Sequence, residues 1–256
     1  MKPIFNIVLL IFISLITLGF SLRHEFQRKV INWSPMKEQN LLTTDYLMGK
    51  FDPSNHSDFV KISIKYADRS GLYLRKEVYE AYKRMHKAAM LAGIDLKILS
   101  ATRNFDYQKK IWEGKWQNIC PPNPSYEDKI KTAKRILRYS AMPGASRHHW
   151  GTDIDMCSVE NAFFRGSKGA KIYAWLKKNA HIYGFCQTYT PKDEERPNGY
   201  NEEKWHWSYQ PSSLAFTKAV KESITNEMFS DFSGAETAID LKIVEDYMLG
   251  LNPACK

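Results

Sequence analysis

The sequence is short of acidic residues and cysteines, and it contains no internal repeat. Only 28 Asp and Glu oppose 37 Lys and Arg in the 256 residues, so the formal net charge is +9 at pH 7. A hydrophobic content of 43% excludes collagen-like, low-complexity and wholly disordered chains. The positive surplus favours an anionic neighbour, either nucleic acid, acidic lipid or an anionic cell-wall polymer. Composition alone does not choose among these three.

The N-terminus lacks an apolar run of ordinary membrane-spanning length. Ile4–Leu18 is 15 residues long with three polar interruptions, whereas a helix needs about 20 apolar residues to cross a bilayer. This length fits the core of a signal peptide, and Gly19 and Ser21 place small residues before a cut ahead of Leu22. We expect export to the periplasm or cell envelope, with residues 1–21 cleaved or kept as an anchor. A buried N-terminal helix is the alternative.

The cysteines form no CxxC pair, which argues against a zinc knot built from cysteines. Four are present, Cys120, Cys157, Cys186 and Cys255, and an even number suits an oxidising compartment. Cys157 and Cys186 each follow a strand-like run. Neighbouring strands would therefore bring these two together and leave Cys120 to pair with Cys255. Unpaired buried thiols are the alternative.

Hydrophobic periodicity predicts an alternation of helices and short strands. The expected helices cover residues 74–93, 104–116 with Asn104 as the cap, 126–139 and 168–179, followed by two helical pieces from Leu214 that are separated at Ser233–Gly234. The expected strands cover 95–100, 152–156, 184–189 and 205–209. This order predicts an α+β fold with a small antiparallel sheet, helices packed on one side and a helical C-terminal tail. The predicted boundaries are an extension at 22–66, a main domain at 67–211 and a packed tail at 212–256.

Reactive side chains gather in two segments. The first contains Ser146, His148, His149, Asp153 and Asp155, and the second contains Glu202, Glu203 and His206. Two imidazoles and a carboxylate from separate segments are the ligands of a catalytic zinc site, which keeps a fourth position for water. On a strand, Asp153 and Asp155 share one face. Either glutamate could take a proton from that water, although a single histidine beside tryptophan is more often structural.

Three segments resemble the signatures of one enzyme family. Ser146-x-His148-x-x-Gly151-x-x-x-Asp155 is similar to SxHxxGxAxD, Glu203-Lys204-Trp205-His206 to ExxH, and Ser100-x-x-Arg103-x-x-x-x-Gln108 to SxxRxxxxQ. These are signatures of the D-alanyl-D-alanine carboxypeptidase and dipeptidase family of zinc metallopeptidases, the VanY-like enzymes. The resemblance covers roughly residues 75–210 with the motifs in family order. It implies the fold that these peptidases share with hedgehog signalling domains.

The resemblance also implies roles for individual residues. It assigns one zinc ion to His148, Asp155 and His206, and it makes Glu203 rather than its neighbour the catalytic base. It further implies a catalytic and substrate-binding Arg103, which would hold the substrate and polarise the scissile carbonyl.

Two further residues, Ser146 and Gln108, correspond to substrate-binding positions of the family. Two positions depart from the family pattern. Asp153 replaces the usual alanine, which suggests an additional hydrogen bond to a ligand histidine. Ser208 stands where many relatives have arginine, so contacts near the site are expected to differ.

The function implied by the resemblance is that of an exported zinc peptidase acting on peptidoglycan stem peptides, foremost as a D-alanyl-D-alanine carboxypeptidase. Dipeptidase, LD-carboxypeptidase and endopeptidase activities stay open. A non-catalytic wall-binding or sensing module is the alternative, and the complete ligand set argues against it. An HNH-type nuclease would place its histidines on one ββα unit, which the sequence does not show. The positive charge then fits an anionic wall or membrane surface and not nucleic acid, and nothing indicates an oligomeric state.

Overall fold

The computed structural model describes residues 42–256, so the predicted export segment and residues 22–41 lie outside the described residues. The helices are α2 (Thr44–Leu47), α3 (Lys76–Leu91), α4 (Phe105–Ile119), α5 (Tyr126–Ile136), α6 (Ser167–Asn179) and α7 (Gln210–Ser223). The strands are β1 (Phe59–Lys61), β2 (Tyr73–Arg75), β3 (Ile98–Ser100), β4 (Asp153–Met156), β5 (Phe185–Gln187) and β6 (His206–Tyr209). Among these described residues, no helix combines the length and the apolar character needed to cross a bilayer.

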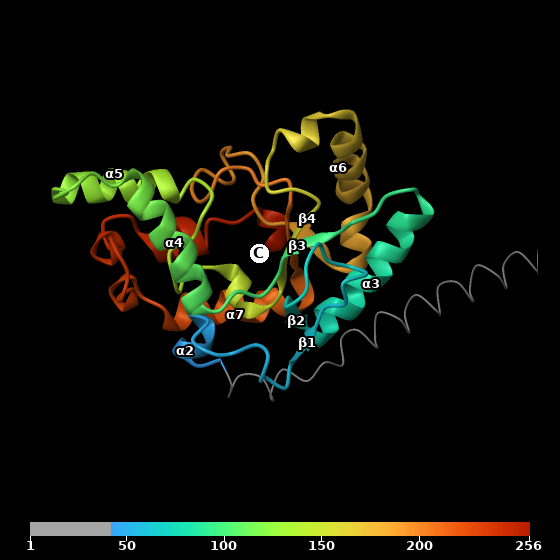
Figure 1. Ribbon diagram of the computed structural model, residues 1–256, viewed down its shortest axis with the longest axis horizontal. Helices are drawn as coiled ribbons and strands as arrows, with labels where there is room; N and C mark the ends of the chain where they lie inside the picture. The colour runs from blue at the N-terminus through green and yellow to red at the C-terminus, as the bar shows by residue number, and fades with distance from the viewer. Residues whose placement is uncertain (1–41) are drawn as a thin grey trace, which may run out of the picture. The chain divides into compact units, whose positions relative to one another are not determined.

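A four-stranded antiparallel sheet in the order β3-β4-β6-β5 forms the centre of the described chain, and β1 and β2 form a separate antiparallel pair. Helices α3 and α6 lie side by side next to this sheet (Figure 1). They share a hydrophobic core with Ile98, Ile154 and Trp207, which come from three of its strands. The opposite face carries polar side chains, as described below. The predicted α+β class with a small antiparallel sheet is confirmed.

A second hydrophobic core joins α2, α4, α5 and α7 to the C-terminal tail. Trp112 and Trp150 are completely buried in it, and the Trp150 indole N–H donates to the Leu47 carbonyl at 3.1 Å. Local signals set the helix ends: the Asn104 side chain caps α4, as expected, and Ser125 and the third residue of α5 cap each other reciprocally. The polar face of the sheet is thus flanked by a second, independently packed group of helices.

The C-terminal tail is α-helical only in its first part. After α7 the chain forms short 3₁₀ turns and one π-helical segment, Ile243–Met248, in place of the second helix predicted from the sequence. Gly234 and Lys242 both adopt left-handed backbone conformations, with φ of +77° and +47°. Each such residue interrupts the α-helical ladder, so apolar residues in this region pack as separate turns.

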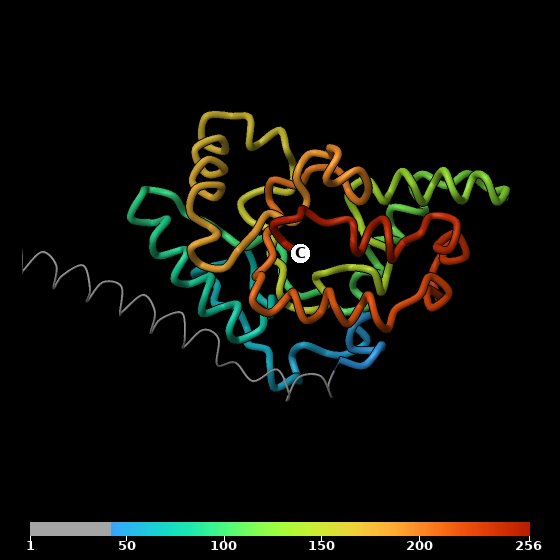
Figure 2. Tube along the Cα trace, turned by 180° about the vertical axis from the view of Figure 1, so that it is seen from behind, coloured from blue at the N-terminus to red at the C-terminus, as the bar shows by residue number. Residues whose placement is uncertain are grey.

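The predicted cysteine pairing is wrong. The structure contains one disulfide, Cys186–Cys255, and the thiols of Cys120 and Cys157 are free. The sheet order explains the error, because β6 lies between β4 and β5. Cys157, at the end of β4, is thus two strand spacings of about 5 Å from Cys186, beyond the reach of a disulfide. The disulfide instead ties the tail to β5, where the end of the chain lies (Figure 2).

We expect removal of this disulfide, in the variant C186A/C255A, to lower the free energy of unfolding by about 2–4 kcal/mol. The bond closes a loop with a sequence separation of 69 residues, and the open loop gives the unfolded chain more freedom. Urea unfolding under non-reducing conditions measures the difference. C120A is the matched control and should change stability far less, since no bond is lost. Equal effects of the two variants would contradict the prediction.

Candidate active site

Two adjacent antiparallel strands, β4 and β6, bring the two reactive segments together. Their register places Asp155 opposite His206 and Asp153 opposite Ser208. Because side chains alternate along a strand, Ile154 points into the core with α3 and α6 while both aspartates face the other side. The predicted sharing of one face by Asp153 and Asp155 is therefore confirmed, and that face meets the His206 ring.

His148 is supplied by a short 3₁₀ turn, Arg147–Trp150, that precedes β4. The Ser146 hydroxyl caps the turn by accepting a hydrogen bond from the His148 N–H at 3.3 Å. The turn ends at Gly151, whose φ of +70° favours glycine, and a Cβ there would lie 2.4 Å from the Phe59 ring. Both ends of the turn are thereby fixed, and the imidazole is held beside β4.

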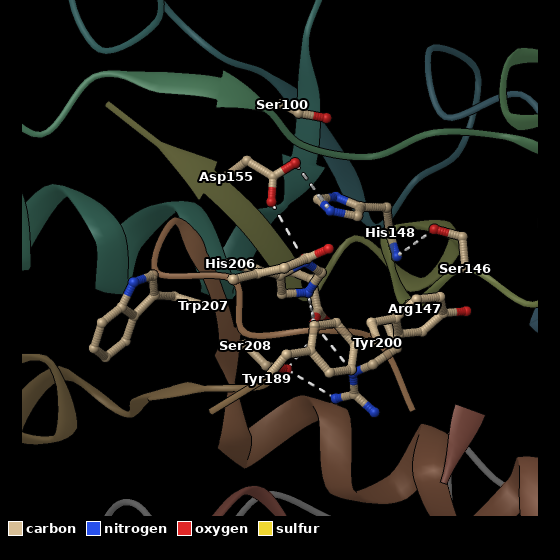
Figure 3. Close-up of polar contacts among 12 residues, drawn as sticks. Ser100, Ser146, Arg147, His148, Asp155, Tyr189, Tyr200, His206, Trp207 and Ser208 are labelled. Carbon is tan, nitrogen blue, oxygen red and sulfur yellow. Dashed lines mark hydrogen bonds and ion pairs between the residues drawn. The ribbon is translucent and has the colours of Figure 1, made fainter. Parts of the chain in front are cut away.

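Three ligand atoms converge at this point (Figure 3). The carboxylate of Asp155 lies 3.3 Å from His148 Nε2 and 3.4 Å from His206 Nδ1, and the three donor atoms lie within 4.8 Å of one another. The far nitrogens are engaged elsewhere: His148 Nδ1 donates to the Ala101 carbonyl at 2.8 Å and His206 Nε2 to Asp153 at 2.9 Å. His148 Nε2 and Asp155 Oδ1 are buried without a hydrogen-bond partner. A metal cation between them would satisfy both atoms.

The electrostatics of these groups also favour a cation. Burial lowers the pKa of His206, but hydrogen bonds to Asp153 and Glu203 and the charge of Asp155 outweigh it and raise the pKa to about 9. Burial and the Arg103 charge lower the pKa of the other imidazole, His148. Burial would raise the pKa of Asp155, but the surrounding histidines outweigh it and lower the pKa. The centre thus combines the neutral His148 imidazole with the ionised Asp155 carboxylate. The His206 imidazole lies among carboxylates, whose negative charge favours a cation at this position.

Asp153 forms a buried network beneath the metal-binding atoms. One oxygen accepts from Arg147 Nε at 3.1 Å and from His206 Nε2 at 2.9 Å, and the other accepts from Thr152 and Ser208 hydroxyls at 2.5 and 3.0 Å. The Arg147 and Asp153 side chains are both 0% exposed. Burial would raise the pKa of Asp153, but Arg147 and His206 outweigh it and hold the pKa well below its usual range. The expected hydrogen bond between Asp153 and a histidine is confirmed, with His206 as the donor. No sequence pattern indicated the role of Arg147.

Glu203 and Arg103 lie 100 residues apart in the sequence, and both lie beside the metal-binding atoms. A Glu203 oxygen lies 3.2 Å from His206 Nδ1, and burial raises the pKa of this carboxyl above its ordinary value. The Arg103 side chain is 19% exposed and lies 3.9 Å from Asp155, with Nη1 donating to the Ser100 hydroxyl at 3.3 Å. Arg103 Nε has no hydrogen-bond partner. This guanidinium therefore has an unused donor beside the metal-binding atoms.

These groups line a cleft of about 590 Å³. Its lining includes Arg103, Lys115, Tyr139, Ser146, His148, Asp155, Arg165, Tyr189, Tyr200, Glu203, Trp205 and His206. Trp205 forms part of the cleft wall. Tyr189 packs its ring 4.9 Å from that of His206. The cleft tyrosines belong to no sequence motif, so no local pattern indicated them.

Two residues singled out from the sequence have other positions. The Gln108 side chain is 1% exposed and does not line the cleft, and its Nε2 donates to the carbonyl of Ala141, a cleft residue, at 2.8 Å. Substrate contact by Gln108 does not fit this placement, and the residue supports the wall instead. His149 Nδ1 donates to the Arg103 carbonyl at 2.6 Å and its Nε2 accepts from the Gly144 N–H at 3.1 Å. Burial lowers the pKa of His149 to about 3, so this imidazole is a neutral structural residue.

Comparison with known proteins agrees with this geometry. Residues 71–212 match the family model of VanY, D-alanyl-D-alanine carboxypeptidase, and this segment is more than half of the chain. The chain belongs to the VanY family. The matched segment contains every residue of the converging set, from Arg103 to His206.

Individual proteins of known sequence or structure are also similar to this chain. A Bacillus subtilis (strain 168) protein, "Putative carboxypeptidase YodJ", is 30% identical over 171 residues, which cover 64% of this chain and 56% of that protein. The chain thus spans about half the length of this curated relative. The LdcB LD-carboxypeptidase structure matches with a TM-score of 0.50 and 24% identity over 78% of this chain and 81% of that one. VanYB bound to D-alanine-D-alanine matches with a TM-score of 0.47 and 21% identity, over 68% and 90% of the chains.

Proposed function

We propose that this VanY-family chain is an exported, zinc-dependent carboxypeptidase that removes the terminal D-Ala from peptidoglycan stem peptides. The observation that carries this proposal is the convergence of His148, Asp155 and His206 with Glu203 and Arg103 in one cleft. Two imidazoles and a carboxylate are a catalytic zinc set, since a fourth position stays open. A wall-binding module without turnover would not need the additional buried glutamate and the unused arginine donor.

Zinc fits the donor set of this site. His148 Nε2, Asp155 and His206 Nδ1 would hold it, and the two orphaned buried atoms gain a partner. Bound there, zinc would supply Lewis acidity, which makes a water more acidic and a carbonyl more electrophilic. The hydrogen bonds from the histidines to Ala101 and Asp153 fix each ring for this purpose.

The residues around the metal position divide the chemistry. Glu203, with its raised pKa, takes the proton of the attacking water and returns it to the leaving amine, which is general base and then general acid catalysis. Arg103 lies 3.9 Å from Asp155 with a partly exposed guanidinium, which would stabilise the charge that develops on the carbonyl oxygen, and such a donor contributes about 3–4 kcal/mol to transition-state stabilisation. Ser146 lines the cleft next to His148 and offers a hydroxyl to the peptide.

A carboxypeptidase must also bind a free terminal carboxylate, and the cleft contains cations for this task. Lys115 and Arg165 line it together with Arg103. Burial lowers the pKa of Lys115, and so does the nearby Arg103 charge. Two cations held close together are stabilised when an anion binds between them. This supports removal of a terminal residue over cleavage inside a peptide.

We therefore expect Lys115→Ala to raise KM about tenfold with little change in kcat, because the lysine binds the carboxylate equally in the ground and transition states. Steady-state kinetics on a soluble stem peptide ending in D-Ala-D-Ala measures both constants. Lys110→Ala, on the same helix but outside the cleft lining, is the matched control. An unchanged KM for Lys115→Ala would remove the carboxylate role.

The direct test of function uses purified stem peptides. Pentapeptides ending in D-Ala-D-Ala, tetrapeptides and cross-linked dimers are incubated with the zinc-loaded protein, with and without a chelator, and the products are identified by mass spectrometry. Loss of one D-Ala from the pentapeptide, abolished by the chelator, is the expected result. Release that survives chelation contradicts zinc dependence, and binding without release supports the non-catalytic module instead.

Export is a separate part of the proposal, since residues 1–21 lie outside the described residues. The disulfide between Cys186 and Cys255 supports it, because such bonds persist in oxidising compartments. N-terminal sequencing of the protein from cell-envelope and soluble fractions tests the idea. Recovery of the chain in the cytoplasm with Met1 and its thiols unoxidised would contradict export.

A further inference from the structure

A second concave surface lies away from the candidate active site, between α6 and the end of α3. It encloses about 860 Å³, which exceeds the volume of the cleft. Residues 92–95, directly after α3, form one wall, and α6 forms the other. The two helices lie next to each other in Figure 1. We call this surface the α6 groove.

The α6 groove is lined by a stripe of lysines. Lys168, Lys171, Trp175 and Lys178 all line it and follow one another at intervals of three, four and three residues, the spacing of a single helix face. The three ammonium groups are therefore distributed along about 15 Å of helix, given a rise of 1.5 Å per residue. This length suits an extended chain of negative charges and exceeds that of a single small anion.

Little negative charge opposes these lysines. Helix α6 contains no acidic residue, and Asp95 is the one carboxylate among the groove-lining residues of the described chain. Asp95 is already engaged, at 2.9 Å from His86 Nε2 and 3.8 Å from Lys97 Nζ. Within the described chain, the lining of the α6 groove therefore carries a surplus of positive charge. Its complement is a polyanion.

The α6 groove is also close to the candidate active site along the chain. Arg165 lines the cleft, and Ser167, only two residues later, lines the α6 groove. A polymer that occupies the groove would thus be held next to the opening where peptides bind. Trp175 is half-buried in the groove and presents an apolar ring with one N–H donor, which suits a sugar ring.

We propose that the α6 groove binds a phosphodiester-linked, sugar-bearing anionic polymer of the cell wall. Lysine ammonium groups bind phosphates as point charges, and three lysines along one helix face can contact several charges of one strand. A concave groove admits such a strand, whereas a flat bilayer would contact only its rim. The choice of a wall polymer rests on the proposed function, but the preference for an extended polyanion does not.

The test measures co-sedimentation of the full-length, zinc-loaded protein with three probes. These are bacterial cell walls that retain their phosphodiester polymer, the same walls after hydrofluoric acid has removed it, and vesicles of phosphatidylglycerol and phosphatidylcholine. The variant K168E/K171E/K178E is compared with K61E/K218E/K221E, which carries the same charge change on exposed lysines elsewhere. Hydrolysis of a soluble stem peptide is measured in parallel.

We expect the groove variant to bind intact walls about tenfold more weakly than the parent, with the control variant within about twofold. The parent protein should bind the stripped walls about tenfold more weakly than the intact walls. Equal losses in both variants, equal binding to stripped walls, or preferential binding to vesicles would each overturn the proposal. Peptide hydrolysis should be unchanged in the groove variant. Wall binding by a parent that hydrolyses no peptide would contradict the proposed function and leave the polyanion site standing.

Discussion

Replacement of Glu203 by glutamine is expected to lower kcat by about 10²–10⁴-fold, the usual contribution of a general base, without loss of zinc. Glutamine keeps the size of the side chain but cannot accept the proton of the attacking water. The three ligand atoms are untouched by the change, because Glu203 contacts His206 and is not among the metal-binding set. Activity on a D-Ala-D-Ala peptide and zinc content by mass spectrometry are measured on the same preparation.

Two variants make this prediction specific. Glu202→Gln is the matched control, since its carboxylate faces the Tyr173 hydroxyl at 3.4 Å and does not line the cleft. It should retain nearly full activity, which also decides between the two glutamates that the spacing left open. His206→Ala should lose both zinc and activity. A fully active E203Q enzyme would eliminate the mechanism.

Replacement of Asp153 by alanine is expected to lower the free energy of unfolding by about 3–5 kcal/mol, because it leaves the Arg147 guanidinium as an unpaired buried charge. Both side chains are fully buried, so solvent cannot replace the lost carboxylate. The same change frees His206 Nε2 from its partner. Loss of such an outer hydrogen bond should weaken zinc binding by about 10–100-fold.

A double variant separates these two effects. Arg147→Met combined with Asp153→Ala removes both charges and should recover most of the lost stability, whereas zinc affinity should stay low because His206 is still unsupported. Urea unfolding of metal-free protein and competition with a zinc chelator are the two measurements. Simple additivity of the single-variant losses would show that the buried pair is not coupled.

The local parts of the site were predictable because they depend on short-range periodicity. Alternation along a strand put Asp153 and Asp155 on one face, and cap residues such as Asn104 fixed helix starts. The family signatures pointed to the residues that β4 and β6 then bring together. None of these inferences needed knowledge of strand order.

The predictions that failed or fell short depend on long-range pairing. The predicted disulfide pairing was wrong because β6 lies between β4 and β5, and no local pattern encodes that strand order. Arg147 precedes a ligand histidine in the sequence and lines the cleft. Its guanidinium is buried against Asp153, a pairing that only the fold reveals. Gln108 lies in a family signature, yet its side chain supports a loop carbonyl.

The attachment of the tail to β5 has a consequence for association between molecules. β5 is one of the two outer strands of the four-stranded sheet. The Asn252 side chain donates to the carbonyl of Gln187, the last residue of β5, at 2.9 Å, and the Asn252 backbone N–H donates to the carbonyl of the next residue, Thr188, at 3.0 Å. A strand with unpaired carbonyls is a template on which another chain can add. The disulfide keeps these donors in place. The tail therefore acts as a guard against edge-to-edge aggregation, and production in a reducing cytoplasm would weaken that protection.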